Sequence, residues 1–198
     1  MKVIFWSDFN CPYSYIGLKR LSNAIDELNL DCEWEMMAFE LSLDIKFTSA
    51  QVEEIKTIAE SEGMDINIAK FTSSRDAHRL VKFTQCNYPK TVLKLIFKIY
   101  EANFTNHDIS SHDVLINISK DCGLDENIIR EFLSTKTYKV EVEVDTEEAI
   151  FNGITAVPHY TIHTDDHRLI IPGAFEKEDF KIALEDLISG KITEKTFL

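Results

Sequence analysis

The sequence has little cysteine, glycine or proline, with 4, 6 and 4 of them in 198 residues. Four widely spaced cysteines are too few for a disulfide scaffold, and the sequence has neither a CxxC pair nor a Cys/His spacing that suits zinc. So little glycine and proline excludes a collagen-like or Pro/Gly-rich disordered chain. We therefore expect a folded protein without a bound metal.

Long apolar runs are also missing. No stretch approaches the roughly 18 apolar residues that a transmembrane helix needs. The apolar start at residues 3–6 ends at Ser7 and Asp8, which makes it too short for a secretory signal. The expected location is therefore the cytoplasm, with no membrane partner.

Positive charge is scarce as well. The chain has 21 Lys and Arg against 34 Asp and Glu, a net charge of −13. Such a chain cannot easily form the strongly basic face that tracks nucleic-acid phosphates, so no nucleic-acid partner is expected. Hydrophobic residues make up 44%, including 13 Phe, which is enough for a large core. The length fits one large domain, or one domain that carries a sizeable insertion.

The first 39 residues read as strand, helix and strand. Residues 2–8 form a short β-type run, and Leu18, Leu21, Ile25 and Leu28 recur at the three- and four-residue spacing of one helix face. Residues 31–39 alternate partly, as a second strand does. A strand–helix–strand unit implies two parallel strands.

The middle of the chain, from about 46 to 139, reads as helical throughout. After it, Asp145 or Thr146 can begin a short helix that ends at Gly153. The expected elements are helices at 75–86, 91–104 and 111–122, one capped by Asp125, a strand opening at Pro158, a strand at 168–172 and a helix at 177–189. The pattern predicts an α/β domain made of residues 1–45 and 140–198, interrupted by an all-helical insertion domain at 46–139.

Cys11 is the main candidate for chemistry, because it lies between the first strand and the first helix. Pro12 suits the first helical position, which places Cys11 at or beside the N-cap. Free N–H groups and the helix dipole there can lower the pKa of a thiol from about 8.5 to roughly 3.5–7.5. Ser14, one turn later, adds a hydroxyl and an N–H that can point at the sulfur. The alternative is a buried, inert cysteine.

Five segments together resemble the DsbA-like thioredoxin-fold family, in its FrnE-like subgroup. They are F-W-S-D-F-N-C-P-Y-S-Y-I-G at 5–17, F-E-L at 39–41, D-A-H-R-L at 76–80, G-I-T-A-V-P at 153–158 and P-G-A at 172–174. The resemblance implies a thioredoxin fold interrupted by a helical domain. It also implies a cis Val157–Pro158 bond beside the nucleophile, whose exposed backbone can pair with an extended peptide or with glutathione.

The chain departs from this family at Ser14, where the family has its second active-site cysteine. A dithiol site resolves its mixed disulfide with that second thiol, and serine cannot. A mixed disulfide on Cys11 must therefore wait for an external thiol or for another cysteine. Cys32, Cys86 and Cys122 lack a helix-start setting and are expected to pack as small hydrophobes.

The site also resembles a second group, the kappa-class glutathione transferases and 2-hydroxychromene-2-carboxylate isomerases. Their motif reads S-P-Y/F-S, and the first serine faces the glutathione sulfur. The sequence C-P-Y-S has Cys11 in place of that serine. The D-A-H-R-L and F-E-L segments favour the FrnE-like side.

Our hypothesis is a monothiol DsbA-like thiol–disulfide oxidoreductase, with Cys11 as nucleophile and Ser14 as its hydrogen-bond donor. The expected substrate-binding residues are Pro12, Tyr13, Val157, Pro158 and His159. The expected partner is a protein or small-molecule disulfide or thiol, bound by a monomer or homodimer. No tightly bound cofactor is expected, and glutathione or another low-molecular-weight thiol is the candidate co-substrate. The alternatives are a glutathione-dependent transferase or isomerase, and a binding module without catalysis.

Three weaker candidates each have a plain structural interpretation. His159 can place an imidazolium near Cys11, or can face away as an alternating strand residue. Arg79, beside His78 on a helix of the insertion, can bind a substrate carboxylate, although a surface ion pair is the favoured interpretation. Asp145, with the two glutamates that follow it, is expected to be an acidic helix start.

Overall fold

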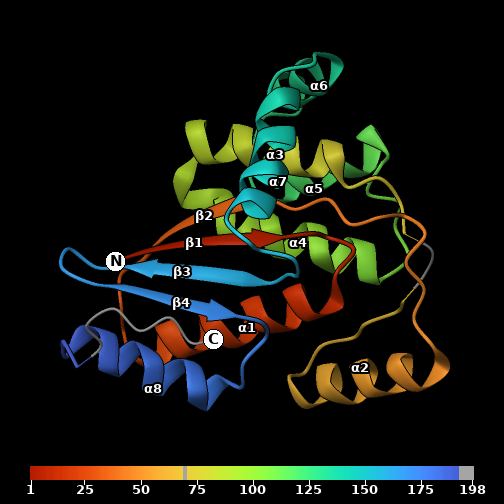
Figure 1. Cartoon of the computed structure of the whole chain (residues 1–198). Coiled ribbons are helices and arrows are strands. Elements are labelled where there is room, and N and C mark those ends of the chain that lie inside the picture. The colour runs from red at the N-terminus through yellow and green to blue at the C-terminus, as the bar shows by residue number, and fades with distance from the viewer. Residues whose placement is uncertain (69–70, 192–198) are drawn as a thin grey trace.

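A four-stranded sheet forms the centre of the computed structural model, which describes residues 1–68 and 71–191. The strands β1 (Lys2–Ser7), β2 (Glu33–Ala38), β3 (His159–His163) and β4 (Arg168–Pro172) lie in the order β2-β1-β3-β4 (Figure 1). Strands β1 and β2 are parallel, which confirms the predicted strand–helix–strand unit. Strand β3 runs antiparallel to both of its neighbours, β1 and β4.

Two helices, α1 (Pro12–Glu27) and α8 (Lys177–Ile188), lie side by side against one face of the sheet (Figure 1). The remaining helices all lie between β2 and β3 in the chain. They are α2 (Ser49–Ser61), α3 (Arg75–Asn87), the short 3-10 helix η1 (Pro89–Thr91), α4 (Val92–Phe104), α5 (His112–Asp121), α6 (Glu126–Ser134) and α7 (Lys139–Phe151). The mixed α/β class and the helical block are therefore as the sequence predicts.

The alternation of side chains along β1 divides the apolar interior between the two faces of the sheet. Phe5 stacks on Tyr160 of β3, which meets Phe180 of α8 edge-on. The next residue, Trp6, points to the other face and packs with Ala149 of α7 and with Ile154. Helices therefore cover the sheet on both sides, and the end of β1 is fixed between them.

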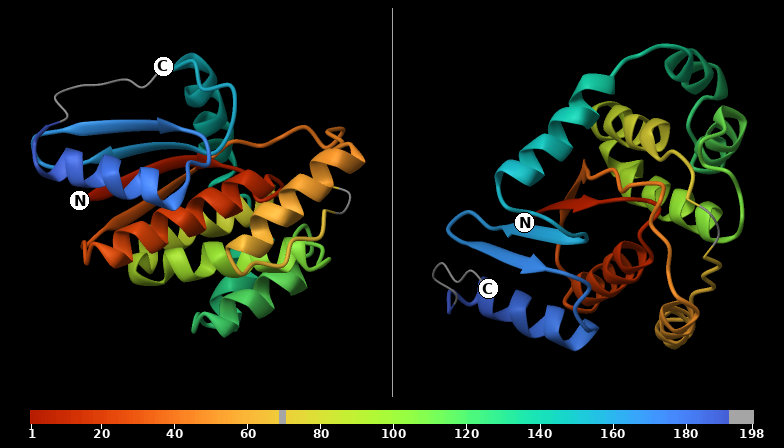
Figure 2. Two further views of the ribbon diagram at one scale, coloured as in Figure 1. Left: turned by 90° about the horizontal axis from the view of Figure 1, so that it is seen from below. Right: turned by 45° about the vertical axis from the view of Figure 1, so that its right-hand side comes forward.

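The main apolar core continues from the sheet into the helical block without a break. Phe5 and Leu18 belong to the same buried cluster as Ile99 of α4 and Leu115 of α5. Helix α2 lies apart from the other helices of this block, beside α1 (Figure 2). The boundaries of the insertion at 46 and 139 stay a prediction, and residues 69–70 and 192–198 lie outside the described residues.

Helix α7 corrects one sequence-based expectation. Asp145 lies in the middle of this helix rather than at the start of a short one. Its carboxylate accepts the backbone N–H of Ala38 at 2.8 Å and pairs with Lys82 Nζ at 2.6 Å. The acidic residue therefore closes the outer edge of β2, a tertiary role that its sequence neighbours do not indicate.

Two smaller expectations have opposite outcomes. Asp125 is the N-cap of α6, where its Oδ1 accepts the N–H groups of Asn127 and Ile128, as predicted. The strand expected to open at Pro158 begins one residue later, at His159.

Gly17 of α1 is required by close packing, which gives a stability prediction. A Cβ at this position would lie 2.7 Å from Tyr160 Oη and 3.0 Å from Ala174 Cβ. We expect Gly17→Ala to lower the free energy of unfolding by about 1–2 kcal/mol, because overpacking outweighs the usual gain of alanine over glycine in a helix. Urea denaturation measures this loss. The Tyr160→Phe background removes the nearest atom, so an equal loss there would contradict the explanation.

Candidate functional site

Cys11 lies at the N-cap of α1, directly after the loop that follows β1. Its own N–H donates to the Asp8 carbonyl at 3.0 Å, and its carbonyl accepts the N–H of Ser14 at 3.1 Å. Pro12 occupies the first helical position, as its missing N–H and fixed φ favour. The sequence therefore predicts the position of the thiol at the helix start correctly.

The Cys11 sulfur faces the segment that precedes β3. Its thiol donates a hydrogen bond to the Val157 carbonyl at 3.4 Å, and the Val157–Pro158 peptide bond is cis. The Pro158 carbonyl accepts the N–H of Gly173 at 2.8 Å, which holds this segment against β4. The structure thus brings Cys11, Val157 and Pro158 together, and it shows that the Val157 carbonyl already has the thiol as a donor.

Burial controls the ionisation of Cys11, and it overturns the expected direction of the pKa shift. The residue is only 6% exposed. The pKa of Cys11 is raised to about 11, and desolvation by burial is the largest cause. The hydrogen bonds of Ser14 lower the pKa of Cys11, while the negative charge of Asp8 raises it and the Tyr13 N–H lowers it by smaller amounts. In the unbound protein Cys11 is therefore a thiol at neutral pH, because burial outweighs the helix N-terminus.

Ser14 lies beside Cys11 on the first turn of α1, as predicted, and is completely buried. Its hydroxyl is close enough to the sulfur to lower the Cys11 pKa. However, Ser14 Oγ makes no hydrogen bond of ordinary geometry with any described residue. The hydroxyl is thus a donor that can turn to a sulfur anion or to a bound ligand.

The remaining predicted site residues differ in how they relate to the thiol. Tyr13 is half-buried beside Cys11, and burial followed by the charge of Glu54 raises its pKa. His159 packs edge-on against Trp6 with ring centroids 6.0 Å apart, and burial lowers its pKa. A neutral His159 does not supply the imidazolium that the sequence suggested.

The helical block fixes the loop before Cys11 through residues that the sequence reasoning missed. Tyr100 Oη of α4 donates to the Asp8 carbonyl at 3.3 Å, and Asn103 Nδ2 donates to the Phe9 carbonyl at 2.8 Å. Asn10 Nδ2 donates to the Thr72 carbonyl at 2.9 Å. Tyr100 and Asn103 stand three residues apart, so they share a helix face. That spacing indicates the shared face, but it does not indicate the loop that this face contacts.

His78 and Arg79 of α3 contact different parts of the protein. His78 is buried against Phe9, with ring centroids 5.0 Å apart. Arg79 forms an ion pair with Asp76 at 2.6 Å, as favoured, but its guanidinium is buried while the Asp76 side chain is partly exposed. Arg79 is 4% exposed and also donates to the carbonyls of Thr135 and Thr137. The guanidinium therefore holds the connection between α6 and α7.

The other three cysteines lie in different surroundings. Cys32 and Cys86 both line a hollow of about 740 Å³ along the outer edge of β2, which Cys11 does not line. Cys86 is exposed, whereas Cys32 is half-buried and burial raises its pKa to about 11. Cys122 is buried at the end of α5, as the packing interpretation predicts, whereas the exposure of Cys86 contradicts it.

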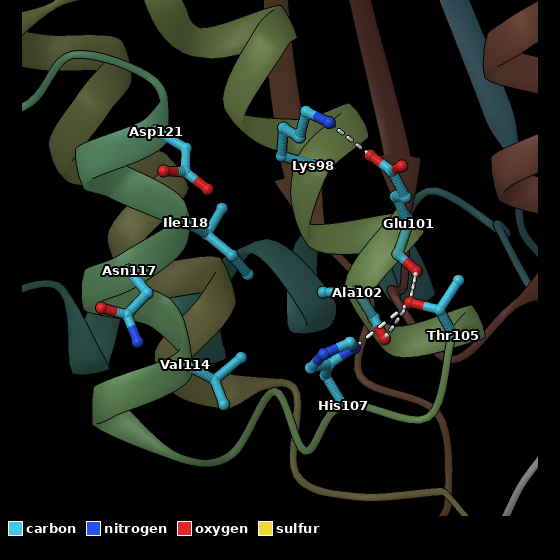
Figure 3. Close-up of a pocket in the computed structure, with 9 residues that line it drawn as sticks. All are labelled: Lys98, Glu101, Ala102, Thr105, His107, Val114, Asn117, Ile118 and Asp121. Atoms are coloured by element: carbon cyan, nitrogen blue, oxygen red, sulfur yellow. Dashed lines mark hydrogen bonds and ion pairs between the residues drawn. The ribbon is translucent and has the colours of Figure 1, made fainter.

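A second hollow, of about 340 Å³, lies between α4 and α5 (Figure 3). Four of its charged and polar side chains bond to one another in two pairs. Lys98 pairs with Glu101 at 2.6 Å, and Thr105 Oγ1 and His107 Nδ1 share a hydrogen bond of 3.2 Å. Residues of the Cys11 loop do not line this hollow, so it is separate from the candidate site.

The described part of the chain has neither a metal-binding cluster nor a membrane-spanning helix. Residues 1–68 and 71–191 hold no group of three or more His, Cys, Asp or Glu side chains placed to bind a metal ion. Within the same residues, every helix is too short or too polar to cross a membrane.

Solved structures share this fold over nearly the whole chain. The probable DsbA oxidoreductase SCO1869 from Streptomyces coelicolor is 24% identical, with a TM-score of 0.78 over 100% of this chain and 94% of its own. A 2-hydroxychromene-2-carboxylate isomerase is 16% identical, with a TM-score of 0.72 over 96% of each chain. The cytosolic disulfide reductase DsbM from Pseudomonas aeruginosa is 14% identical, with a TM-score of 0.73 over 96% of this chain and 99% of its own.

The fold of these neighbours is thioredoxin-like, which agrees with the sheet, the helical block and the Cys11 position described above. The model of the DSBA-like thioredoxin domain matches residues 2–185. This match spans β1 to α8 and includes both Cys11 and the Val157–Pro158 segment. The chain therefore belongs to the family of DSBA-like thioredoxin domains.

Proposed function

We propose that the protein is a thiol–disulfide oxidoreductase that works through one thiol, with a mixed disulfide at Cys11 as its intermediate. One observation carries this proposal. Cys11 lies at the N-cap of α1, and its thiol donates a hydrogen bond to the Val157 carbonyl at 3.4 Å. Family membership and the disulfide reductase among the structural neighbours support it. Ser14 stands where a resolving thiol would be needed.

The reaction proceeds in two exchange steps. The Cys11 thiolate attacks one sulfur of a substrate disulfide, forms the mixed disulfide and releases the other sulfur as a thiolate, which takes a proton. An external thiol such as glutathione then attacks, as its thiolate, and replaces Cys11 on the remaining substrate sulfur. The substrate disulfide loses one thiol, the external thiol ends in a new disulfide, and Cys11 returns to its starting state.

The raised pKa of Cys11 shapes these two steps. A thiol with a pKa of about 11 is a poor leaving group, so external thiols release it slowly from the mixed disulfide. The mixed disulfide also removes the cost of burying a charge on sulfur, because it is neutral. We therefore propose a long-lived mixed disulfide. A protein or small-molecule disulfide in the cytosol, with glutathione as second thiol, is the proposed setting, in line with the cytosolic reductase of the same fold.

We expect reduction of a small disulfide to depend on both Cys11 and an added thiol. Without glutathione, at most one equivalent of substrate should react, whereas added glutathione should allow turnover. Cys11→Ser should remove this activity, and the matched change at the exposed Cys86, Cys86→Ser, should keep it. Chromatography that separates the first substrate thiol from glutathione measures the rate at which this thiol is released, once per cycle. Equal rates for the wild type and Cys11→Ser would contradict the proposal.

A second candidate is a glutathione-dependent transferase or isomerase. The observation that favours it is the protonated state of Cys11, whose S–H and the neighbouring Ser14 O–H are both donors for a glutathione sulfur anion. In that case glutathione binds without a bond to Cys11. Reaction of bound glutathione with an electrophile, in a Cys11→Ser variant that keeps its rate, distinguishes this candidate from the first.

A further inference from the structure

The Asp8 carboxylate joins three parts of the chain beside the candidate site. Asp8 follows β1, three residues before Cys11, and is completely buried. Its Oδ1 accepts the N–H of Asn10 at 3.1 Å, and its Oδ2 accepts the N–H of Leu41 in a short hydrogen bond. His78 Nε2 of α3 lies 3.8 Å from Oδ1. One side chain thus touches the Cys11 loop, the segment after β2 and the helical block.

Two sequence motifs that the proposed function leaves unused meet at this carboxylate. Leu41 ends the F-E-L segment, and His78 is the centre of D-A-H-R-L. Both lie far from Cys11 in the sequence, yet each contacts the residue that receives the Cys11 N–H on its backbone carbonyl. The backbone of Asp8 holds Cys11 directly, and its side chain ties that backbone to the rest of the protein.

The hydrogen bonds of Asp8 hold the loop before Cys11, whereas its charge acts on the ionisation of the thiol. An anion close to a thiol disfavours the thiolate, and this repulsion adds to the effect of burial on the pKa of Cys11. The same residue therefore fixes the position of the thiol, and its charge adds to the burial that keeps the thiol protonated.

We propose that Asp8 is a positioning residue for Cys11, which fixes the loop before the thiol and whose charge opposes formation of the thiolate. This proposal deepens the proposed function and rests on it for the reactive role of that thiol. The titratable groups around Cys11 and Asp8 are Tyr13 on α1, His78 on α3, Tyr100 on α4 and Tyr160 on β3. Among these groups, Asp8 is the one that carries a carboxylate.

The test measures the rate at which iodoacetamide alkylates Cys11 as a function of pH, with each cysteine resolved by peptide mapping. We expect Asp8→Asn to move the midpoint of the Cys11 profile to lower pH, and to raise the rate at pH 8 about tenfold for every pH unit by which the midpoint falls. Asp26→Asn is the matched control, because it removes the same charge from an exposed position at the far end of α1. This control should leave the Cys11 profile unchanged.

Asp8→Glu separates charge from loose packing, since it keeps the carboxylate and should keep the midpoint near that of the wild type. If Asp8→Asn does not fold, Asp8→Ser provides the same comparison, because its hydroxyl can still accept the Asn10 N–H. A profile that stays in place in the folded neutral variant, or that moves equally in Asp8→Glu, overturns the proposal. Alkylation needs no substrate, so its outcome is independent of whether the turnover assay supports the proposed function.

Discussion

Replacing Ser14 with cysteine is expected to raise the rate of disulfide reduction at least about tenfold, because an internal thiol resolves a mixed disulfide without waiting for an external one. Ser14 lies one turn after Cys11, completely buried, and its hydroxyl already influences the sulfur. A thiol at this position can attack Cys11 Sγ and expel the substrate sulfur. That sulfur is a better leaving group than Cys11, whose pKa is about 11.

Insulin reduction with a dithiol reductant measures the gain, and Ser14→Ala is the matched control, since it removes the hydroxyl without adding a thiol. We expect Ser14→Ala to show no gain. If mass spectrometry shows the new thiol bonded to Cys11 but the rate does not rise, the segment at Val157 is not built to receive a disulfide.

The pH dependence of Cys11 alkylation is the second large effect. A thiol with a pKa of about 11 is ionised in only about one molecule in 10⁴ at pH 7, so its alkylation rate should increase roughly tenfold per pH unit until the pH approaches that pKa. The sign follows from burial, because desolvation disfavours the charged form of a thiol. The exposed Cys86 should therefore be alkylated before Cys11 at neutral pH. A Cys11 midpoint below pH 8 would show that the helix N-terminus outweighs burial.

The position of Cys11 was predictable from the sequence, whereas its ionisation was not. A strand, a Cys-Pro pair and a helical repeat follow one another in the chain, so local rules place the thiol at a helix start. The solvent exposure of the sulfur depends on the segment at Val157, which lies 146 residues away. Local sequence gives the favourable helix terminus but not the desolvation that opposes it.

The same distinction explains the errors at Asp145 and His159. An acidic cluster before a glycine is typical of a helix start, and only the arrangement of α7 beside the edge of β2 shows that Asp145 binds the Ala38 N–H. His159 follows Pro158 in the chain, but its ring packs edge-on against Trp6 of β1. The predicted cap at Asp125 was correct because that contact lies within three residues.

The Cys11 loop illustrates how the helical block serves the site. Tyr100 and Asn103 of α4 bind the carbonyls of Asp8 and Phe9. The loop therefore has partners on the block at two successive residues, in addition to the side chains of Asp8 and Asn10. Helices inserted between β2 and β3 thus hold the loop that precedes the thiol, and they share one apolar core with the sheet.

The most direct test of the central claim is to map the mixed disulfide itself. The protein is incubated with glutathione disulfide, unreacted thiols are blocked in acid, and the peptides are identified by mass spectrometry without reduction. The account predicts glutathione on the peptide that contains Cys11, formed faster as the pH rises and lost slowly when free glutathione is added. Glutathione on Cys86 alone, with Cys11 still a free thiol at pH 9, would contradict it.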